Sequence, residues 1–278
     1  MLEILKAILY GIVEGITEWL PISSTGHLIL LEKLVPFAET SEEFFAMFEV
    51  VIQLGAILAV VILFWNQIFP FHFGKSKETY GCVVDKNIFV LWFKILVACV
   101  PAAVIGLLFD DVFNALFYRY EVVAIALIVF GIAFLVIENW NKGRNPKIAS
   151  LSELTYQTAL IIGVFQLIAA IFPGTSRSGA TIVGALLIGV SRTVAAEFTF
   201  FLAIPVMFGA SLLKIVKFGF HFTSMEASIL IVAMVTAFLV SLLVIKFLMG
   251  YIKKHDFKVF GWYRIVLGLL VLLLFPIL

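Results

Sequence analysis

The sequence predicts an all-α polytopic membrane protein, with six transmembrane helices and two re-entrant helix–loop–helix segments in an inverted-topology repeat. Composition is the first observation behind this prediction. Of 278 residues, 63% are hydrophobic and 13% are charged, whereas soluble domains carry about 25% charged residues. A soluble protein of this length cannot bury so much apolar surface in one core. The second observation is that two Ser- and Gly-rich polar clusters interrupt the apolar sequence, and we expect them to form the functional site.

The expected elements fall into two halves of similar organisation, because a spanning helix needs about 20 mostly apolar residues. Residues 1–140 form the first repeat and residues 141–278 the second, within one structural unit. Each repeat opens with a broken apolar stretch and continues with three spans. The elements are the pair at 2–35 with spans 45–65, 88–108 and 122–137, then the pair at 154–190 with spans 198–213, 229–247 and 259–277.

The two broken stretches are interrupted by Pro, Gly, Ser and charged residues. The breaks are residues 14–27 (EGITEWLPISSTGH) and residues 173–181 (PGTSRSGAT). Non-helical backbone at membrane depth is tolerated only where protein covers it or water lines it. We therefore expect each stretch to enter the membrane as a helix, turn at the cluster and return to the side it came from.

The charges of the loops favour this arrangement. Loops 66–87, 139–150 and 250–258 each hold three basic residues, and the positive-inside rule makes them cytoplasmic. Loop 36–44 holds three Glu and no Lys or Arg, which permits an outside location. Six spans satisfy these assignments only if both broken stretches turn back, the first from outside and the second from the cytoplasm. The basic residues are Lys75, Lys77, Lys86, Lys142, Arg144, Lys147, Lys253, Lys254 and Lys258.

Opposite sides of entry are what an inverted repeat produces, and the sequence contains a weak one. Residues 11–14 (GIVE) align with residues 163–166 (GVFQ), which places residues 21–26 (PISSTG) on residues 173–178 (PGTSRS). Transporter-like folds built in this way have their site near the midplane, where the broken helices meet.

The first cluster contains two carboxylates. Glu14 and Glu18 are four residues apart, so a helix directs both to one face. A carboxylate inside a membrane needs a partner: a divalent cation, the arginine of the second cluster, or a shared proton. Mg²⁺ or Ca²⁺ suits carboxylate and phosphate oxygens, which makes Glu14 and Glu18 candidate metal ligands. The alternative is that one of them lies at the interface and caps a helix.

Hydroxyl groups follow these carboxylates. Ser23, Ser24, Thr25 and Gly26 precede a helix that is expected to start near His27, and a helix N-terminus with free N–H groups binds anions. An ordinary Ser or Thr cap would explain one hydroxyl but not three. His27 is either a structural histidine or a nucleophile, base or leaving-group acid.

The second cluster repeats this design and adds a cation. Ser176, Arg177, Ser178 and Gly179 precede an expected helix at 180–189, and Thr181 lies in its first turn. The arginine fork matches phosphate oxygens, although a structural ion pair with Glu18 or Glu14 is the alternative. The combined groups suit binding and cleavage of a phosphorylated molecule, and the membrane implies a lipid tail.

Other classes of function fit less well. A net charge of +1 without a basic tract argues against nucleic-acid binding, and Cys82 and Cys99 lack a metal-binding spacing. A transporter or flippase for a lipid phosphate is the main alternative, because inverted repeats and broken helices are typical of transporters. His27 beside paired carboxylates is more chemistry than binding alone needs.

The motifs resemble those of a known family. Residues 14–27, with Glu14-x-x-x-Glu18 before LPISSTGH, and residues 172–182 (FPGTSRSGATI) are similar to the bacterial undecaprenyl-diphosphate phosphatases of the bacitracin-resistance type. Residues 48–58 (FEVVIQLGAIL) and 189–192 (GVSR) are also similar, so the resemblance covers essentially the whole chain.

The resemblance implies hydrolysis of a polyprenyl diphosphate lipid, undecaprenyl diphosphate, to the monophosphate carrier that is reused for peptidoglycan. It further implies dependence on a divalent cation and a fold of six spans with two re-entrant pairs. The implied location is the bacterial inner (plasma) membrane, among membrane lipids, with a site open to the outer face and the ability to form a homodimer.

The resemblance also implies roles for single residues. Glu14 and Glu18 match the acidic motif, with a metal-binding or base role. The nucleophile is Ser24, with His27 or a Glu as its base, or else His27 itself; Ser24 is favoured because it lies at the centre of the loop. The phosphate loops are matched by Ser23, Ser24, Thr25, Gly26 and His27 in the first cluster and by Ser176, Arg177, Ser178, Gly179 and Thr181 in the second.

Overall fold

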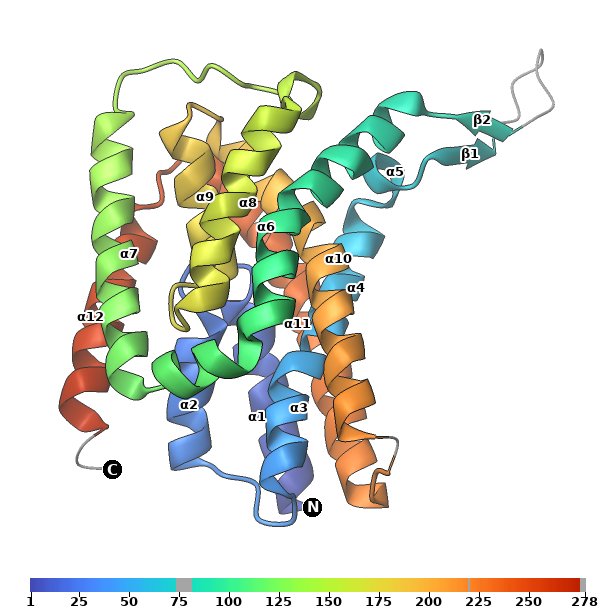
Figure 1. Cartoon of the computed structure of the whole chain (residues 1–278), viewed down its shortest axis with the longest axis vertical. Helices are drawn as coiled ribbons and strands as arrows, with labels where there is room; N and C mark the ends of the chain where they lie inside the picture. The colour runs from blue at the N-terminus through green and yellow to red at the C-terminus, as the bar shows by residue number, and fades with distance from the viewer. Residues whose placement is uncertain (74–81, 220, 276–278) are drawn as a thin grey trace.

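The computed structural model describes residues 1–73, 82–219 and 221–275, and most of its regular structure is helical (Figure 1). Lys75 and Lys77 lie outside the described residues, as do positions 276 and 277 of the last expected span. The helices are α1 (Leu2–Thr17), α2 (Ser24–Leu34), α3 (Glu42–Val51), α4 (Gln53–Leu63), α5 (Trp65–Ile68), α6 (Lys86–Phe117), α7 (Tyr120–Trp140), the 3₁₀ turn η1 (Leu151–Glu153), α8 (Tyr156–Ile171), α9 (Arg177–Leu187), α10 (Arg192–Phe218), α11 (Ser224–Ile252) and α12 (Lys258–Leu274).

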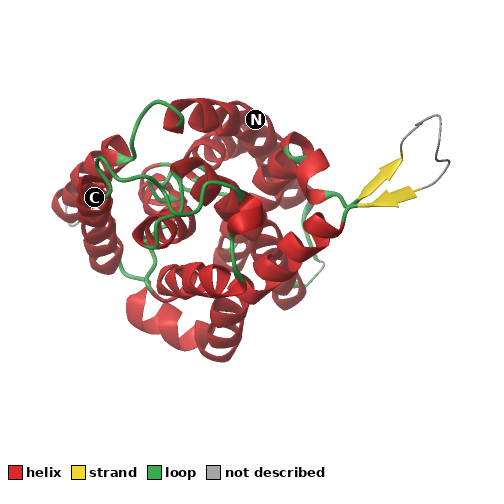
Figure 2. Ribbon diagram, turned by 90° about the horizontal axis from the view of Figure 1, so that it is seen from above, coloured by secondary structure: helices red, strands yellow, loops and turns green. Residues whose placement is uncertain are grey.

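One element was not expected from the sequence. Two strands of three residues each, β1 (Phe71–Phe73) and β2 (Cys82–Val84), pair in antiparallel register. Figure 2 shows this hairpin standing out from the side of the helical body.

Five helical segments in the described part of the chain are long and apolar enough to cross a membrane: 42–63, 86–106, 120–140, 192–218 and 224–252. The expected span at 45–65 corresponds to α3 and α4, which adjoin at Ile52. The helix expected as the sixth span, α12, has 17 residues. The sixth crossing and the re-entrant arrangement in a bilayer therefore stay predictions.

Capping residues set the ends of the long helices beyond the expected spans. Ser191 precedes α10 and its side chain accepts a hydrogen bond from the Val194 N–H. Thr223 and Glu226 form a reciprocal capping box at the start of α11. Such caps satisfy N–H groups that have no partner within the helix. Apolar windows miss these ends because the caps are polar.

The outward faces of the long helices are apolar. On α11, Leu239 and Leu243 are 54% and 71% exposed, on one face and one turn apart. Ile125, Val129 and Val136 on α7 are also exposed. A contiguous exposed apolar face is costly in water, so lipid is the solvent that suits this surface.

Two helix hairpins point toward each other in the middle of the molecule. In Figure 1, α1 and α2 rise from the lower end and turn back, whereas α8 and α9 descend from the upper end and turn back. The first helices of both pairs have 16 residues, and the second helices both have 11. The two pairs therefore match in helix length and point in opposite directions.

The two halves of the chain interlock. Helix α1 packs along α11 of the other half, α8 packs along α6, and α7 packs along α12. In the α1–α11 and α8–α6 pairs, the backbones approach closely at a glycine. A methyl group on Gly11 would lie 2.6 Å from the Ala233 carbonyl oxygen, and a methyl group on Gly163 would lie 2.3 Å from the Ala98 carbonyl oxygen. Gly11 and Gly163 are the residues that the repeat alignment pairs.

Candidate active site

Each hairpin turns on a serine in an unusual conformation. Ser23 and Ser176 have φ of 74° and 70°, and they are the two non-glycine residues with positive φ in the described ranges. Each side chain accepts a hydrogen bond from the N–H three residues on, Gly26 for Ser23 (3.3 Å) and Gly179 for Ser176 (3.1 Å). Positive φ is costly for residues with a side chain, so the two turns share a strained cap.

The caps correct the sequence alignment of the clusters by one residue. Alignment at the prolines pairs Ser23 with Thr175, but the residue with the same conformation and cap is Ser176. The second turn holds one more residue between its proline and its cap. Gly174 accommodates the extra residue, because its φ is 89° and it has no side chain. A methyl group at this position would lie 2.5 Å from the Val123 carbonyl oxygen.

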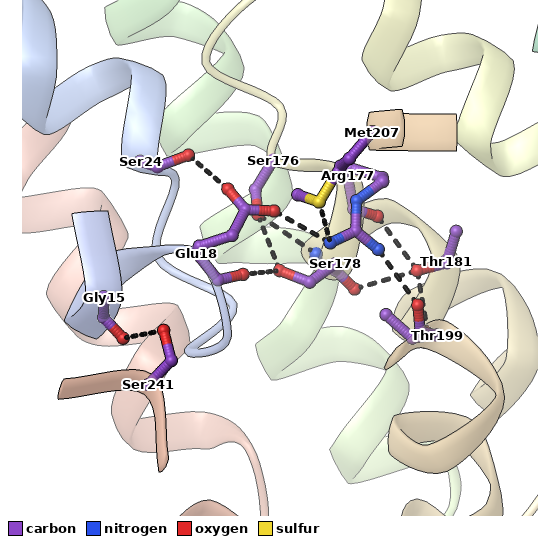
Figure 3. A network of polar contacts seen from close by, with 11 residues as sticks. Gly15, Glu18, Ser24, Ser176, Arg177, Ser178, Thr181, Thr199, Met207 and Ser241 are labelled. Carbon is purple, nitrogen blue, oxygen red and sulfur yellow. Dashed lines mark hydrogen bonds and ion pairs between the residues drawn. The ribbon is translucent and has the colours of Figure 1, made fainter. Parts of the chain in front are cut away.

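Glu18 joins the two clusters. Its Oε2 accepts a hydrogen bond from Ser24 Oγ at 2.7 Å, and its Oε1 pairs with Arg177 Nη2 at 2.8 Å (Figure 3). Its backbone carbonyl accepts from Ser178 Oγ at 3.1 Å. Glu18 and Ser24 are 6% and 8% exposed, so the ion pair and its hydrogen bonds lie in a low-dielectric environment that strengthens them.

Thr199 holds the arginine from its other side, and sequence analysis missed this residue. The Thr199 carbonyl accepts a hydrogen bond from Arg177 Nη1 at 2.9 Å, and its hydroxyl lies 2.8 Å from that of Thr181 (Figure 3). Thr181 Oγ1 also donates to the Arg177 carbonyl at 2.9 Å. Arg177 Nε has no hydrogen-bond partner among the described residues, so the guanidinium retains a free donor.

Glu14 differs from Glu18 in the hydrogen-bond partners of its carboxylate. It is fully buried, and neither carboxylate oxygen has a hydrogen-bond partner in the described structure. Gln166, its counterpart in the repeat alignment, is 2% exposed and its amide is also without a partner there. A buried carboxyl group without a partner is costly, and both Glu14 oxygens are left available to a ligand.

The donor set fits a metal ion only in part. Within the residues that the structure describes, no three His, Cys, Asp or Glu side chains come together as a metal cluster. Glu14 offers two free oxygens, whereas both oxygens of Glu18 are occupied. Mg²⁺ keeps several waters and is often held by one or two carboxylates plus substrate phosphates, which matches so sparse a set.

His27 lies on the first turn of α2, and both of its ring nitrogens have partners other than Ser24. Its Nδ1 is 2.7 Å from the Ser23 carbonyl oxygen, and its Nε2 is 2.6 Å from the Tyr263 hydroxyl. A carbonyl only accepts, so Nδ1 carries the proton and Nε2 accepts from Tyr263 in the neutral ring. The carboxylate that accepts the Ser24 hydrogen bond is therefore that of Glu18, while both ring nitrogens of His27 have other partners.

Arg264 is the largest omission of the sequence analysis. This fully buried residue of α12 donates to carbonyls of both turns, Pro21 in the first (3.3 Å) and Gly174 and Thr175 in the second (3.0 and 2.7 Å). Its acceptors in the described ranges are all backbone carbonyls. A charged residue ten positions before the end of an apolar helix was the available signal, since charges at membrane depth mark functional sites.

The remaining predicted residues lie close to the turns. Gly26 and Gly179 supply the capping N–H groups, and a methyl group on Gly179 would lie 2.9 Å from Arg264 Nη1. Ser176 Oγ is 3.1 Å from Ser178 Oγ. Thr25 is half-buried on the first turn of α2.

The formal charges around the turns balance. Glu14 and Glu18 carry two formal negative charges, and Arg177 and Arg264 carry two formal positive charges. Glu18, Arg177 and Arg264 belong to the two turns or contact them, and Glu14 lies on the preceding helix α1. An incoming diphosphate would add negative charge to a balanced, desolvated region. Binding it then needs Arg177 to leave Glu18, or an added cation.

The chain is similar to known proteins along nearly its whole length. Residues 7–270 match the family described as "Bacitracin resistance protein BacA". The chain is 66% identical over 275 residues to an undecaprenyl-diphosphatase of Desulfitobacterium hafniense, covering 99% of this chain and 97% of that one. It is 63% identical over 276 residues to undecaprenyl-diphosphatase 1 of Clostridium acetobutylicum (99% and 98%) and 61% identical over 273 residues to an undecaprenyl-diphosphatase of Enterococcus faecalis (98% and 97%).

Proposed function

The chain belongs to the bacitracin resistance protein BacA family, and from this premise we infer that it is an integral membrane phosphatase acting on undecaprenyl diphosphate. The products are undecaprenyl phosphate and inorganic phosphate. This reaction recycles the lipid carrier of peptidoglycan synthesis and confers bacitracin resistance. The observation that carries the proposal is the Ser24–Glu18–Arg177 network, which combines a nucleophile, a base and a phosphate-binding cation.

We propose that Ser24 attacks the terminal phosphorus. The Ser24 proton passes to Glu18, the bond from phosphorus to the bridging oxygen breaks, and undecaprenyl phosphate leaves. Water then attacks the phosphoserine and releases inorganic phosphate, while Glu18 returns the proton to Ser24. The 2.7 Å hydrogen bond from Ser24 to Glu18 supports this assignment, because a base must be within hydrogen-bond reach of its proton.

Arg177 binds the terminal phosphate in this proposal. Its unpartnered Nε and the pairing of its Nη2 with Glu18 support the role, since a phosphate oxygen can replace that carboxylate. Further phosphate ligands are Ser23, Thr25, Gly26, Ser176, Ser178 and Gly179, with Thr181 fixing the arginine turn.

Glu14, with Glu18, would hold the divalent cation, Mg²⁺ or Ca²⁺, together with substrate oxygens. The cation would neutralise the charge of the diphosphate in a region that is otherwise balanced. The free oxygens of buried Glu14 support this assignment. We expect a chelator to abolish phosphate release and added Mg²⁺ or Ca²⁺ to restore it; release that persists in chelator would exclude a metal role.

In the bilayer, we propose six spans and two re-entrant pairs, with the site opening to the outer face of the plasma membrane. The opposed hairpins support this orientation, as does the place of the α7–η1 loop, with its three basic residues, at the upper end in Figure 1. A homodimer is part of the proposal on family grounds alone.

The test is phosphate release by purified protein in detergent from undecaprenyl or farnesyl diphosphate with Mg²⁺. Arg177→Ala is expected to lower kcat/KM by about 100- to 1,000-fold, the range for loss of one transition-state donor. Arg119→Ala, at a 66% exposed side chain, is the matched control. Lipid that binds but stays intact would favour the flippase alternative and contradict the phosphatase.

The nucleophile has its own test. Phosphoserine survives acid, whereas phosphohistidine is hydrolysed by it. Enzyme quenched during turnover with ³²P-labelled substrate should carry an acid-stable label. The label should be absent from the Ser24→Ala variant and present in the His27→Ala variant. Acid-labile label that depends on His27 would reverse the assignment.

A further inference from the structure

A polar cavity lies apart from the Glu18 network, which contributes none of its lining residues. Its volume is about 580 Å³, within the ~300–1,000 Å³ typical of small-ligand sites. The end of α7 with its following loop, the turn between α9 and α10, and the end of α11 form its walls. The loop crosses the upper end of the molecule in Figure 1. The charged lining residues are Glu138, Arg144, Lys147, Arg192 and Lys253.

The acidic lining residue is already neutralised. Glu138 is 1% exposed, and it accepts hydrogen bonds from Arg192 Nε at 2.9 Å and from the Phe257 N–H at 3.0 Å. A buried carboxylate with this many donors keeps its partners. Arg192 thus cancels Glu138, and Arg144, Lys147 and Lys253 leave the cavity with an excess of positive charge.

Backbone hydrogen bonds fix the walls of the cavity. The N–H groups of Lys147 and Ile148 both donate to the Gly189 carbonyl, at 2.8 and 3.2 Å, and the Ser191 N–H donates to the Ile148 carbonyl at 2.8 Å. The loop that bears Lys147 is therefore tied to the turn before α10. A site with fixed walls loses little entropy when a ligand binds.

The rim of the cavity is apolar where it meets the outer surface. Trp140 and Leu187 line it and are 58% and 54% exposed, and the Arg144 guanidinium lies 4.4 Å from the centre of the Trp140 ring. Exposed Trp beside basic residues is typical of the membrane–water interface. A free anion would gain nothing from contact with exposed apolar side chains. A lipid, in contrast, can contact both the cations of the cavity and its apolar rim.

We propose that this cavity binds the phosphate-bearing headgroup of an anionic phospholipid of the surrounding bilayer. The phosphate lies among Arg144, Lys147 and Lys253, and the acyl chains leave over Trp140 and Leu187. The site is independent of the hydrolytic reaction.

The test is binding of phosphatidylglycerol to the full-length protein in neutral detergent, measured by native mass spectrometry, with phosphatidylcholine as the zwitterionic reference. The variant Lys147→Gln/Lys253→Gln is compared with Lys142→Gln/Lys254→Gln. The control removes the same charge from the same two loops, at exposed lysines that do not line the cavity.

We expect the cavity variant to bind phosphatidylglycerol about 30-fold more weakly, since each basic residue near an anionic lipid adds about fivefold to the affinity. The control should change less than about threefold. Equal losses in both variants would show diffuse surface attraction and overturn the site. Displacement of the lipid by equimolar inorganic phosphate would overturn the lipid as its occupant. Unchanged melting temperatures of both variants confirm that they are folded.

Discussion

At the scale of residues, two neighbouring glutamates differ in their surroundings. Glu18 has its Oε1 and Oε2 bound to Arg177 and Ser24, while both oxygens of Glu14 lack a hydrogen-bond partner in the described residues. Both are buried, Glu14 within α1 and Glu18 directly after its last residue. The sequence predicts that the pair is functional, but the different partners imply that substitutions will affect stability in opposite directions.

We expect Glu14→Gln to raise the free energy of unfolding by about 1 kcal/mol in metal-free buffer, because it removes an unpaired buried carboxyl group. Glu18→Gln should lower it by about 3 kcal/mol, because it leaves the Arg177 charge buried without a counter-charge. Both should abolish phosphate release. Thermal unfolding in detergent measures the first effect, and a fall in melting temperature for Glu14→Gln would contradict a free carboxylate.

Arg264 is a single residue of α12 that contacts both turns. One guanidinium donates to carbonyls of both turns, so it fixes the distance between the two turns. It does not belong to the Glu18 network, and we regard it as a positioning residue.

Arg264→Lys should lower the free energy of unfolding by about 3 kcal/mol, because a single ammonium cannot bridge both turns and buried carbonyls lose their donor. The folded fraction should also show a reduced kcat. Arg119→Lys, in an exposed ion pair, is the control and should change stability by less than about 0.5 kcal/mol. Normal kcat in folded Arg264→Lys protein would rule out the positioning role.

At the scale of elements, small residues decide how closely helices pack. Gly11 and Gly163 let α1 and α8 approach the backbones of α11 and α6. Helix association in lipid depends on such close packing, because the hydrophobic effect does not drive helices together in a solvent that is itself apolar. Helix α1 carries Glu14, so its distance from α11 also sets the position of the site.

Gly11→Ala should destabilise the protein by about 1–3 kcal/mol, the usual cost of overpacking, because the methyl group would meet the Ala233 carbonyl. Gly106→Ala in α6 is the matched control, since a methyl group there meets nothing within 4 Å. It should be neutral or stabilising by up to about 1 kcal/mol through helix propensity. Equal melting temperatures for the two variants would show that α1 and α11 can separate without cost.

At the scale of the whole molecule, the loops divide between two ends. The α2–α3 loop lies at the lower end in Figure 1, and the α7–η1 loop lies at the upper end. The proposed orientation puts the acidic loop outside and the basic loop inside.

Cysteine labelling tests this orientation. In a chain with Cys82→Ser and Cys99→Ser, Glu39→Cys should react with an impermeant maleimide in intact cells, whereas Lys142→Cys should react only after permeabilisation. Both positions are exposed. Labelling of both from the outside would contradict the topology.

The sequence by itself determined the membrane class, the two polar clusters and the residues within them. These features are local: composition, apolar runs and turn residues are read within a window of about 20 residues. Glu14, Glu18, Ser24 and Arg177 were all identified in this way.

Only the tertiary structure decided which partner each group has. Glu18 and Arg177 are separated by 159 residues, and Pro21 and Arg264 by 243. A hydrogen bond depends on positions within a few tenths of an ångström, which helix packing sets and sequence spacing does not. For this reason the one-residue offset between the turns, the Tyr263 partner of His27 and the role of Arg264 became visible only in the folded chain.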